Sequence, residues 1–172
     1  MASGSVFMNV GLPGSGKSTW VRRQLERPGH SLVVVSKDAL RQMIWAGKYV
    51  YQADREPMIQ DMNLSMVMLA LTNGHDVIVD ECHIDEKHRM QLVGPLRDIF
   101  EHDIKIIYVM HTTDPEADKD LCIARRLKET KGIENPERWV GIIESFVETY
   151  QEPTEYEVEF IDRIVLPKDI TL

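Results

Sequence analysis

The residues with the clearest chemical meaning form a glycine-rich run near the start of the sequence. Positions 11–19 complete the pattern G-x-x-x-x-G-K-[ST] directly after the apolar run Val6–Val10. Glycines let the backbone curl so that successive N–H groups point inward, and the first turn of the next helix adds its positive dipole end. In this pattern the lysine reaches the β- and γ-phosphates and the serine a magnesium ion. The run predicts a nucleoside triphosphate site made by Gly11, Pro13, Gly14, Ser15, Gly16, Lys17, Ser18 and Thr19.

A carboxylate and an arginine follow the second apolar run, Leu32–Val35. Asp38 and Arg41 are three residues apart, so they share one face of a helix. A carboxylate there can accept a proton from an attacking hydroxyl. An arginine one turn later can bind a phosphate with two parallel hydrogen bonds. Asp38 is also a natural helix N-cap, which is the alternative interpretation of that residue.

Two further acidic residues follow the third apolar run, Val77–Val79. Asp80 closes that run in the position where many phosphate-loop enzymes hold a magnesium-linked carboxylate, although it also suits simple strand termination. Glu81, Cys82 and His83 are adjacent and would point in alternating directions along an extended segment. We therefore do not expect them to converge on a transition metal.

A cluster of cations lies between the fourth and fifth apolar runs. Arg125 and Arg126 belong to a helical stretch within a segment, about residues 115–135, that could serve as a lid over the phosphates. A guanidinium group there would stabilise the charge that develops on a transferring phosphoryl group. The alternative is a solvated basic helix end, favoured by the helix dipole.

The elements that must position these residues alternate between strand and helix. The expected strands are Val6–Val10, Leu32–Val35, Val77–Val79, Ile104–Met110 and Ile164–Leu166, and the segments between them are long enough for helical crossovers. The expected helices are Lys17–Arg27, Asp38–Ala46, Pro57–Thr72, Glu86–Glu101, Pro115–Lys131 and Pro136–Tyr150. This pattern predicts one α/β domain over residues 1–172, with a parallel five-stranded sheet and helices on both faces.

Composition restricts the partners and the setting of the chain. The net charge of −8 argues against a protein that coats nucleic acid, yet residues 1–52 carry seven Lys or Arg and only two acidic residues. The two cysteines are too few for a disulfide framework, and no apolar run approaches the length of a bilayer span. We expect a soluble cytoplasmic protein without a membrane partner.

Taken together, these motifs resemble the polynucleotide 5′-hydroxyl kinase branch of the P-loop kinases, including its phage members. The resemblance implies a transfer of phosphate from ATP, with Mg²⁺, to the 5′-hydroxyl of a DNA or RNA end. It implies that Asp38 is the general base, that Arg41 contacts the acceptor phosphate, and that Asp80 and Glu81 lie beside the acceptor. Lys17, with Arg125 or Arg126, would then stabilise the transferring phosphoryl group, and Ser18 would bind the metal.

The sequence departs from that branch at two places. Glu81 and Cys82 replace small polar residues, so a negative charge stands near an anionic acceptor. A second lid arginine four residues after the first is missing, and Lys128 or Lys131 would have to substitute for it without the planar fork of arginine.

Other acceptors and other functions remain open from the sequence alone. A hydroxymethylated base in DNA, a nucleoside, a nucleotide or another small alcohol would suit the same chemistry. Trp45, Tyr49 and Tyr51 are candidate stacking surfaces for a base, or they pack locally. A nucleotide-gated switch is disfavoured because no Asn-Lys-x-Asp motif is present, and a kinase-fold toxin is a further alternative. The spacing of Met58, Met62, Met66 and Leu69 predicts a core-facing stripe, with a substrate groove as the alternative.

Overall fold

A parallel sheet of five strands forms the centre of the molecule. The computed structural model describes residues 4–27, 29, 31–130, 135–170 and 172. The strand order is β2-β3-β1-β4-β5, and every neighbouring pair is parallel. The strands are β1 (Gly4–Val10), β2 (Leu32–Val35), β3 (Asp76–Val79), β4 (Ile104–Met110) and β5 (Arg163–Val165). The predicted α/β fold with a parallel five-stranded sheet is confirmed.

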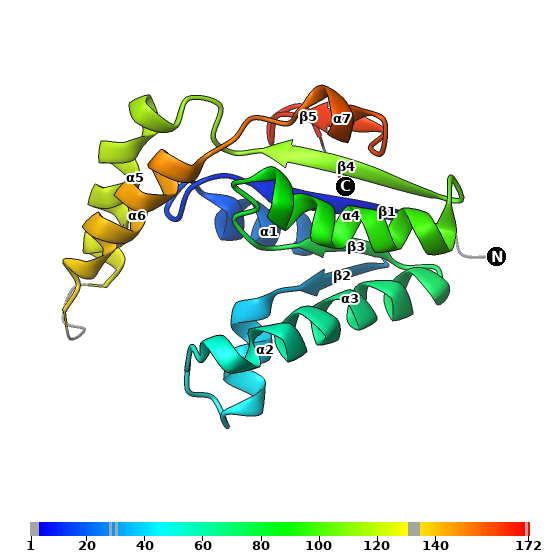
Figure 1. Ribbon diagram of the computed structural model, residues 1–172, viewed down its shortest axis with the longest axis horizontal. Coiled ribbons are helices and arrows are strands. Elements are labelled where there is room, and N and C mark those ends of the chain that lie inside the picture. Colours follow the sequence, from blue (N-terminus) through cyan, green and yellow to red (C-terminus); the bar gives the residue numbers. More distant parts are fainter. Residues whose placement is uncertain (1–3, 28, 30, 131–134, 171) are drawn as a thin grey trace.

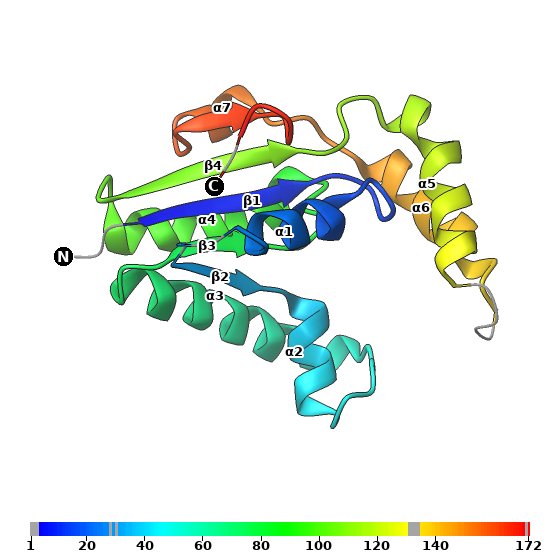
Figure 2. The same ribbon diagram turned by 180° about the vertical axis from the view of Figure 1, so that it is seen from behind.

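Helices connect the strands and cover both faces of the sheet. α3 and α4 lie on one face and α1 on the other (Figure 1, and from behind in Figure 2). The helices are α1 (Lys17–Leu25), α2 (Lys37–Ile44), α3 (Glu56–Thr72), α4 (Glu86–Phe100), α5 (Pro115–Glu129), α6 (Arg138–Thr149) and α7 (Glu155–Val158), with a short 3₁₀ helix η1 (Ala53–Arg55). The expected helices match α1 to α6 with shifts at their ends, whereas η1 and α7 were not expected.

The apolar strands account for the two apolar cores that lie on the faces of the sheet. Alternate residues of β1 point to opposite faces, so Val6 and Met8 pack toward α3 and α4 while Phe7 packs with Trp20 of α1. Because β1 pairs with β3 on one side and with β4 on the other, its side chains are buried over most of its length. The strand that leads into the glycine-rich loop is therefore a buried inner strand of the sheet.

The helix pair α5–α6 and the helix α2 project from the carboxyl edge of the sheet. Both views place α5 and α6 at one end of this edge and α2 at the other, with the loop that follows β1 between them (Figures 1 and 2). Ligands of open α/β sheets bind outside the carboxyl ends of the strands. The fold thus collects the candidate residues along one edge.

The predicted core-facing stripe on α3 is wrong. Met58, Met66 and Leu69 are exposed, and the buried face of the helix is formed by Ile59, Asn63, Val67, Ala70 and Leu71. The helix is apolar on more than one side, so the spacing of its methionines does not identify which side packs against the sheet.

A buried ion pair fastens the end of the chain to the sheet. Arg89 of α4 and Glu157 of α7 are both fully buried, with Nε to Oε1 at 2.6 Å and Nη2 to Oε2 at 2.8 Å. Arg89 also donates to the carbonyl oxygens of His83 and Gln151, and the Tyr108 hydroxyl donates to Glu157. Burial of this pair is tolerated because its polar atoms are partnered.

In the described part of the chain, no helix is both long and apolar enough to span a bilayer.

Candidate active site

The loop between β1 and α1 has the backbone that phosphate binding needs. Gly14 and Gly16 have φ values of 87° and 101°, in the left-handed region that favours glycine. A Cβ at Gly14 would lie 2.7 Å from the carbonyl oxygen of Cys122 in α5, so only glycine fits there. Gly16 occupies the N-cap position of α1 and offers no side chain to its first amides. Those amides are directed at the space over the loop, where an anion would complete their hydrogen bonds.

Lys17 and Ser15 complete the phosphate loop. The Lys17 ammonium is largely buried and donates to the carbonyl oxygens of Gly11 at 2.9 Å and Leu12 at 2.7 Å. The Ser15 hydroxyl is buried and has no hydrogen-bond partner within the described residues. A buried hydroxyl without a partner is costly, and a phosphate oxygen would satisfy it. The residues of this loop therefore fit the phosphates of a nucleotide.

Asp80 is held by a chain of hydrogen bonds that runs across three strands. The Asn9 amide nitrogen donates to Asp80 Oδ1 at 3.0 Å, and His111 Nε2 donates to Asn9 Oδ1 at 3.0 Å. Asn9 lies on β1 and is fully buried, His111 follows β4, and Asp80 follows β3. One carboxylate oxygen of Asp80 is thus fixed by Asn9, which leaves its other oxygen and the exposed side chain of Ser18 available to a cation. The pair fits the oxygen ligands that Mg²⁺ prefers.

Two histidines around Asn9 are kept neutral by burial. Burial and the charge of Lys17 lower the pKa of His111 to about 3. Burial also lowers the pKa of His83, whose Nδ1 donates to the Asn9 carbonyl oxygen at 2.9 Å. A neutral His111 that donates from Nε2 keeps the Asn9 amide oriented with its nitrogen toward Asp80.

Asp38, Arg41 and Glu56 form a cluster where α2 meets the start of α3. Asp38 Oδ1 accepts from Arg41 Nη1 at 2.6 Å, and the other two nitrogens of Arg41 bind Glu56 at 2.9 and 2.5 Å. The Asp38 side chain is 69% exposed, whereas that of Arg41 is 11% exposed. Ser36, not Asp38, occupies the N-cap position of α2, so capping does not explain Asp38. The carboxylate is open to an incoming hydroxyl and is oriented by one guanidinium group.

The negative charge of Glu81 is neutralised within the site. Glu81 Oε2 lies 3.1 Å from the ammonium of Lys37, the first residue of α2. This ion pair joins the end of β3 to the start of α2, so Asp80 and Asp38 belong to neighbouring segments of one edge. Glu81 Oε1 is buried without a partner in the described residues.

The two adjacent arginines of α5 make different contacts. Arg125 Nη1 donates to the carbonyl oxygen of Gly14 at 3.2 Å, so this guanidinium lies against the phosphate loop. Arg126 instead bonds Glu129 at 3.1 Å and lies 4.7 Å from the centre of the Trp139 ring in α6. Arg125 therefore contacts the glycine-rich loop, while Arg126 joins α5 to α6. Lys128 lies in the last turn of α5, and Lys131 falls outside the described residues.

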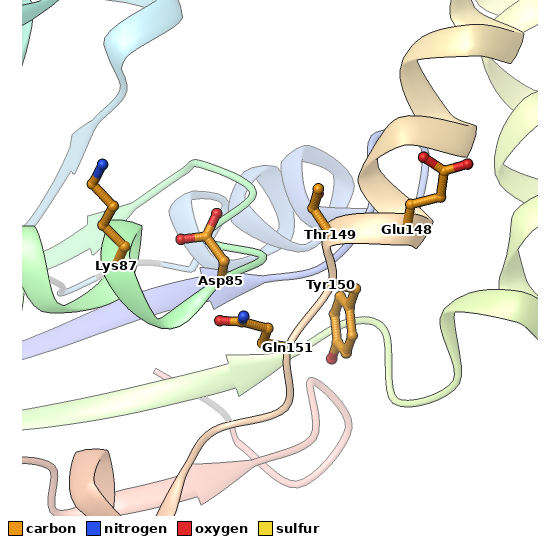
Figure 3. A pocket seen from close by; sticks show the side chains of 6 residues that line it. All are labelled: Asp85, Lys87, Glu148, Thr149, Tyr150 and Gln151. Carbon is orange, nitrogen blue, oxygen red and sulfur yellow. The ribbon is translucent and has the colours of Figure 1, made fainter.

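Two open hollows lie beside this edge and do not contain the phosphate loop. One, of about 510 Å³, lies between the start of α4 and the end of α6, where Gln151 Oε1 accepts from the Glu86 amide (Figure 3). The other, of about 480 Å³, lies next to the ends of β4 and β5. The first is lined by Asp85, Lys87, Glu148, Thr149, Tyr150 and Gln151. Its mixed charges give no reason to place the phosphates there.

Several residues of the site were not predicted. Asn9 and His111 orient Asp80, and Glu56 holds Arg41. Asn9 carried a signal, because it is the one amide in the otherwise apolar run Val6–Val10. No sequence pattern indicated a role for Glu56, because only folding brings the start of α3 next to α2.

The sheet order, the glycine-rich loop and the carboxylates at its edge define a P-loop nucleotide-binding fold of the kinase type. The chain belongs to the AAA domain family, whose sequence profile matches residues 6–149. No curated protein matches the sequence at a significant level.

Solved structures with this fold carry different activities. A chain of the Pnkp1/Rnl/Hen1 RNA repair complex has a TM-score of 0.61 and 22% identity over 88% of this chain and 47% of its own length. A fungal RNA kinase has a TM-score of 0.63 and 16% identity, with 96% and 75% covered. APS kinase CysC of Mycobacterium tuberculosis, bound to AMPPNP and APS, has a TM-score of 0.58 and 19% identity, with 97% and 90% covered. This chain spans about half the length of the RNA repair chain, and at these identities the likeness shows the fold and not the acceptor.

Proposed function

We propose that the chain is an ATP- and Mg²⁺-dependent kinase that phosphorylates the 5′-hydroxyl of a DNA or RNA end. The observation that carries the proposal is the Asp38–Arg41 pair, an exposed and oriented carboxylate on the same sheet edge as the phosphate loop. In the reaction the hydroxyl proton passes to Asp38 as the hydroxyl oxygen bonds to the γ-phosphorus. The bond from that phosphorus to the β–γ bridging oxygen breaks, and ADP leaves.

The donor side is assigned to the loop and to α5. Lys17 and the first amides of α1 would bind the β- and γ-phosphates, and Arg125 would approach them from the lid. Ser18 and Asp80 would hold Mg²⁺, which neutralises charge on the phosphate oxygens when it is bound. The hydrogen bond from Arg125 Nη1 to the carbonyl oxygen of Gly14 supports this assignment.

A second acceptor class is favoured by Glu56. Its two hydrogen bonds occupy Nε and Nη2 of Arg41, the pair of donors that would otherwise bind a phosphate. Asp38, Arg41 and Glu56 together carry one negative charge, which disfavours a phosphate beside the reacting hydroxyl. A hydroxymethylated base in DNA, or a nucleoside, presents a hydroxyl without that neighbouring phosphate. The likeness to RNA kinases supports the first class, and the occupied fork supports the second.

A transfer assay with γ-labelled ATP tests the proposal and separates the two classes. The acceptors are 5′-hydroxyl RNA, 5′-hydroxyl DNA, hydroxymethyl-base DNA, nucleosides and nucleotides. Asp38→Asn should lower the rate about 10²–10⁴-fold because it removes the base. Asp98→Asn changes an exposed aspartate of α4 in the same way and should leave the rate unchanged. Near-normal transfer by Asp38→Asn or by Lys17→Ala would contradict the mechanism.

A further inference from the structure

Two tyrosines beside the candidate base are exposed. Tyr49 and Tyr51 lie in the segment between α2 and η1, with 50% and 62% of their surface accessible. The guanidinium carbon of Arg41 lies 5.8 Å from the centre of the Tyr49 ring and 5.6 Å from that of Tyr51. Both rings thus lie beside Arg41, while at least half of the surface of each residue stays accessible to a partner outside the chain.

Trp45, in the same segment, is less exposed than the two tyrosines and contacts a different arginine. It is only partly exposed, and the guanidinium of Arg55 lies 5.1 Å from its ring centre. Trp45 therefore packs locally and joins the end of α2 to η1. Of the three aromatic residues in this segment, the two tyrosines are the ones with at least half of their surface accessible.

Tyr49 is also coupled to Asp38. Burial of its hydroxyl raises the pKa of Tyr49, and the negative charge of Asp38 raises it further. Both groups contact Arg41, since Asp38 Oδ1 accepts from Arg41 Nη1 at 2.6 Å and the centre of the Tyr49 ring lies 5.8 Å from the guanidinium carbon. A molecule stacked on the tyrosines thus lies next to the group that would deprotonate it.

We propose that Tyr49 and Tyr51 form a stacking platform for a nucleobase of the acceptor, an inference that rests on the kinase function proposed above. The cluster of Asp38, Arg41 and Glu56 has a net negative charge and cannot by itself attract an anionic end. Stacking on aromatic rings supplies affinity without charge and accepts any base, since every base has a π-face. The acceptor is therefore a base-bearing hydroxyl compound and not a sugar or another aliphatic alcohol.

The test compares acceptors that differ only in the terminal base. A 5′-hydroxyl dinucleotide and its abasic analogue are assayed with Tyr49→Ala, Tyr51→Ala and the two phenylalanine variants. For the base-bearing acceptor the alanine variants should raise KM on the order of 10-fold. The abasic acceptor should show a much smaller change, and Tyr→Phe should restore the KM because the ring remains. Tyr156→Ala, a similarly exposed tyrosine of α7, is the matched control and should change neither acceptor.

Equal changes for the two acceptors, or no change in KM with the alanine variants, would overturn the platform. If the wild-type protein phosphorylates no acceptor, the proposed function fails, and the platform is then tested by equilibrium binding of a fluorescent 5′-hydroxyl oligonucleotide. Binding that is weakened by Tyr51→Ala and restored by Tyr51→Phe supports the platform without the kinase activity. Binding that is insensitive to both variants overturns it.

Discussion

Arg41 and Glu56 are joined by two hydrogen bonds, from Nε to Oε1 at 2.9 Å and from Nη2 to Oε2 at 2.5 Å. The pair links α2 to the start of α3, and the third nitrogen of the same guanidinium holds Asp38. The hydrogen bonds with Glu56 raise the pKa of Arg41 beyond its usual value even though burial lowers it. Arg41 is thus a permanent cation whose first effect is on the orientation of Asp38.

Replacing Arg41 with lysine tests this orientation. Lysine keeps the charge but lacks the planar fork, so it cannot hold Asp38 and Glu56 together. We expect kcat to fall about 10–100-fold, which is the size of a lost hydrogen bond to a charged group. Steady-state kinetics with a nucleoside and with its 3′-phosphate then separate two roles. A larger loss for the phosphate-bearing acceptor indicates a phosphate contact as well, whereas equal losses assign Arg41 to Asp38 alone. Arg23→Lys on the exposed side of α1 is the control.

Asn9 should control the use of Mg²⁺ through Asp80. Asn9→Leu preserves the approximate volume but removes the donor to Asp80 and the acceptor for His111. Each polar group left without a partner costs about 1–3 kcal/mol, so the free energy of unfolding in urea should decrease. The Mg²⁺ concentration for half-maximal transfer should increase, because Asp80 is no longer held in place. His111→Gln retains an amide donor and should have a smaller effect on both quantities. An unchanged Mg²⁺ requirement in Asn9→Leu would show that the position of Asp80 does not depend on its hydrogen bond with Asn9.

Gly14 is expected to be intolerant of a side chain for two reasons. Its φ is 87°, and an added Cβ would meet the backbone of Cys122 in α5 at 2.7 Å. Gly14→Ala must therefore displace either the phosphate loop or α5, and we expect KM for ATP to increase at least 10-fold. Gly47→Ala is the matched control, because Gly47 has a φ of 89° but no atom within 4 Å of an added Cβ. Both variants should lose stability from backbone strain, but only Gly14→Ala should weaken nucleotide binding in isothermal titration calorimetry.

Much of the fold was readable from the sequence because each strand is a separate apolar run. Leu32–Val35 and Ile104–Met110 begin and end where the runs do, and the glycines of the loop are fixed by backbone geometry. η1 and α7 were missed because each is a single turn without a periodic pattern. Glu56 and His111 were missed because their roles depend on contacts between segments 15 and 102 residues apart. Local sequence patterns carry no information about such contacts.

The two lid arginines should have separable effects. Arg125 contacts the phosphate loop, so Arg125→Ala should lower kcat by about 10²-fold or more, in the range expected for loss of a charge-stabilising group. Arg126 lies over Trp139, so Arg126→Ala should mainly lower stability, by about 0.5–2 kcal/mol, through the lost cation–π contact. Each variant is the control for the other when rates and urea unfolding are measured together. A large rate loss in Arg126→Ala with normal stability would reverse the assignment.

Glu157 should make the protein sensitive to acid. Burial alone would raise the pKa of Glu157, but the hydrogen bonds from Arg89 and from the Thr154 amide outweigh it and hold the pKa below its usual value. A lowered pKa in the folded state means that the unfolded chain binds a proton first. The stabilisation is therefore complete above the pKa of the unfolded chain, about 4.3, and is lost as the pH falls through the lower pKa of the folded state.

At pH 7, Glu157→Gln should lower the free energy of unfolding by about 3–5 kcal/mol, because it leaves the buried Arg89 charge without its counterion. The difference from wild type should shrink below pH 4, where the wild-type carboxylate also becomes protonated. Urea unfolding at pH 7, 5 and 3 measures this trend, with Glu155→Gln at the exposed start of α7 as the control. A difference that stays constant from pH 7 to pH 3 would mean that the Glu157 charge does not stabilise the fold.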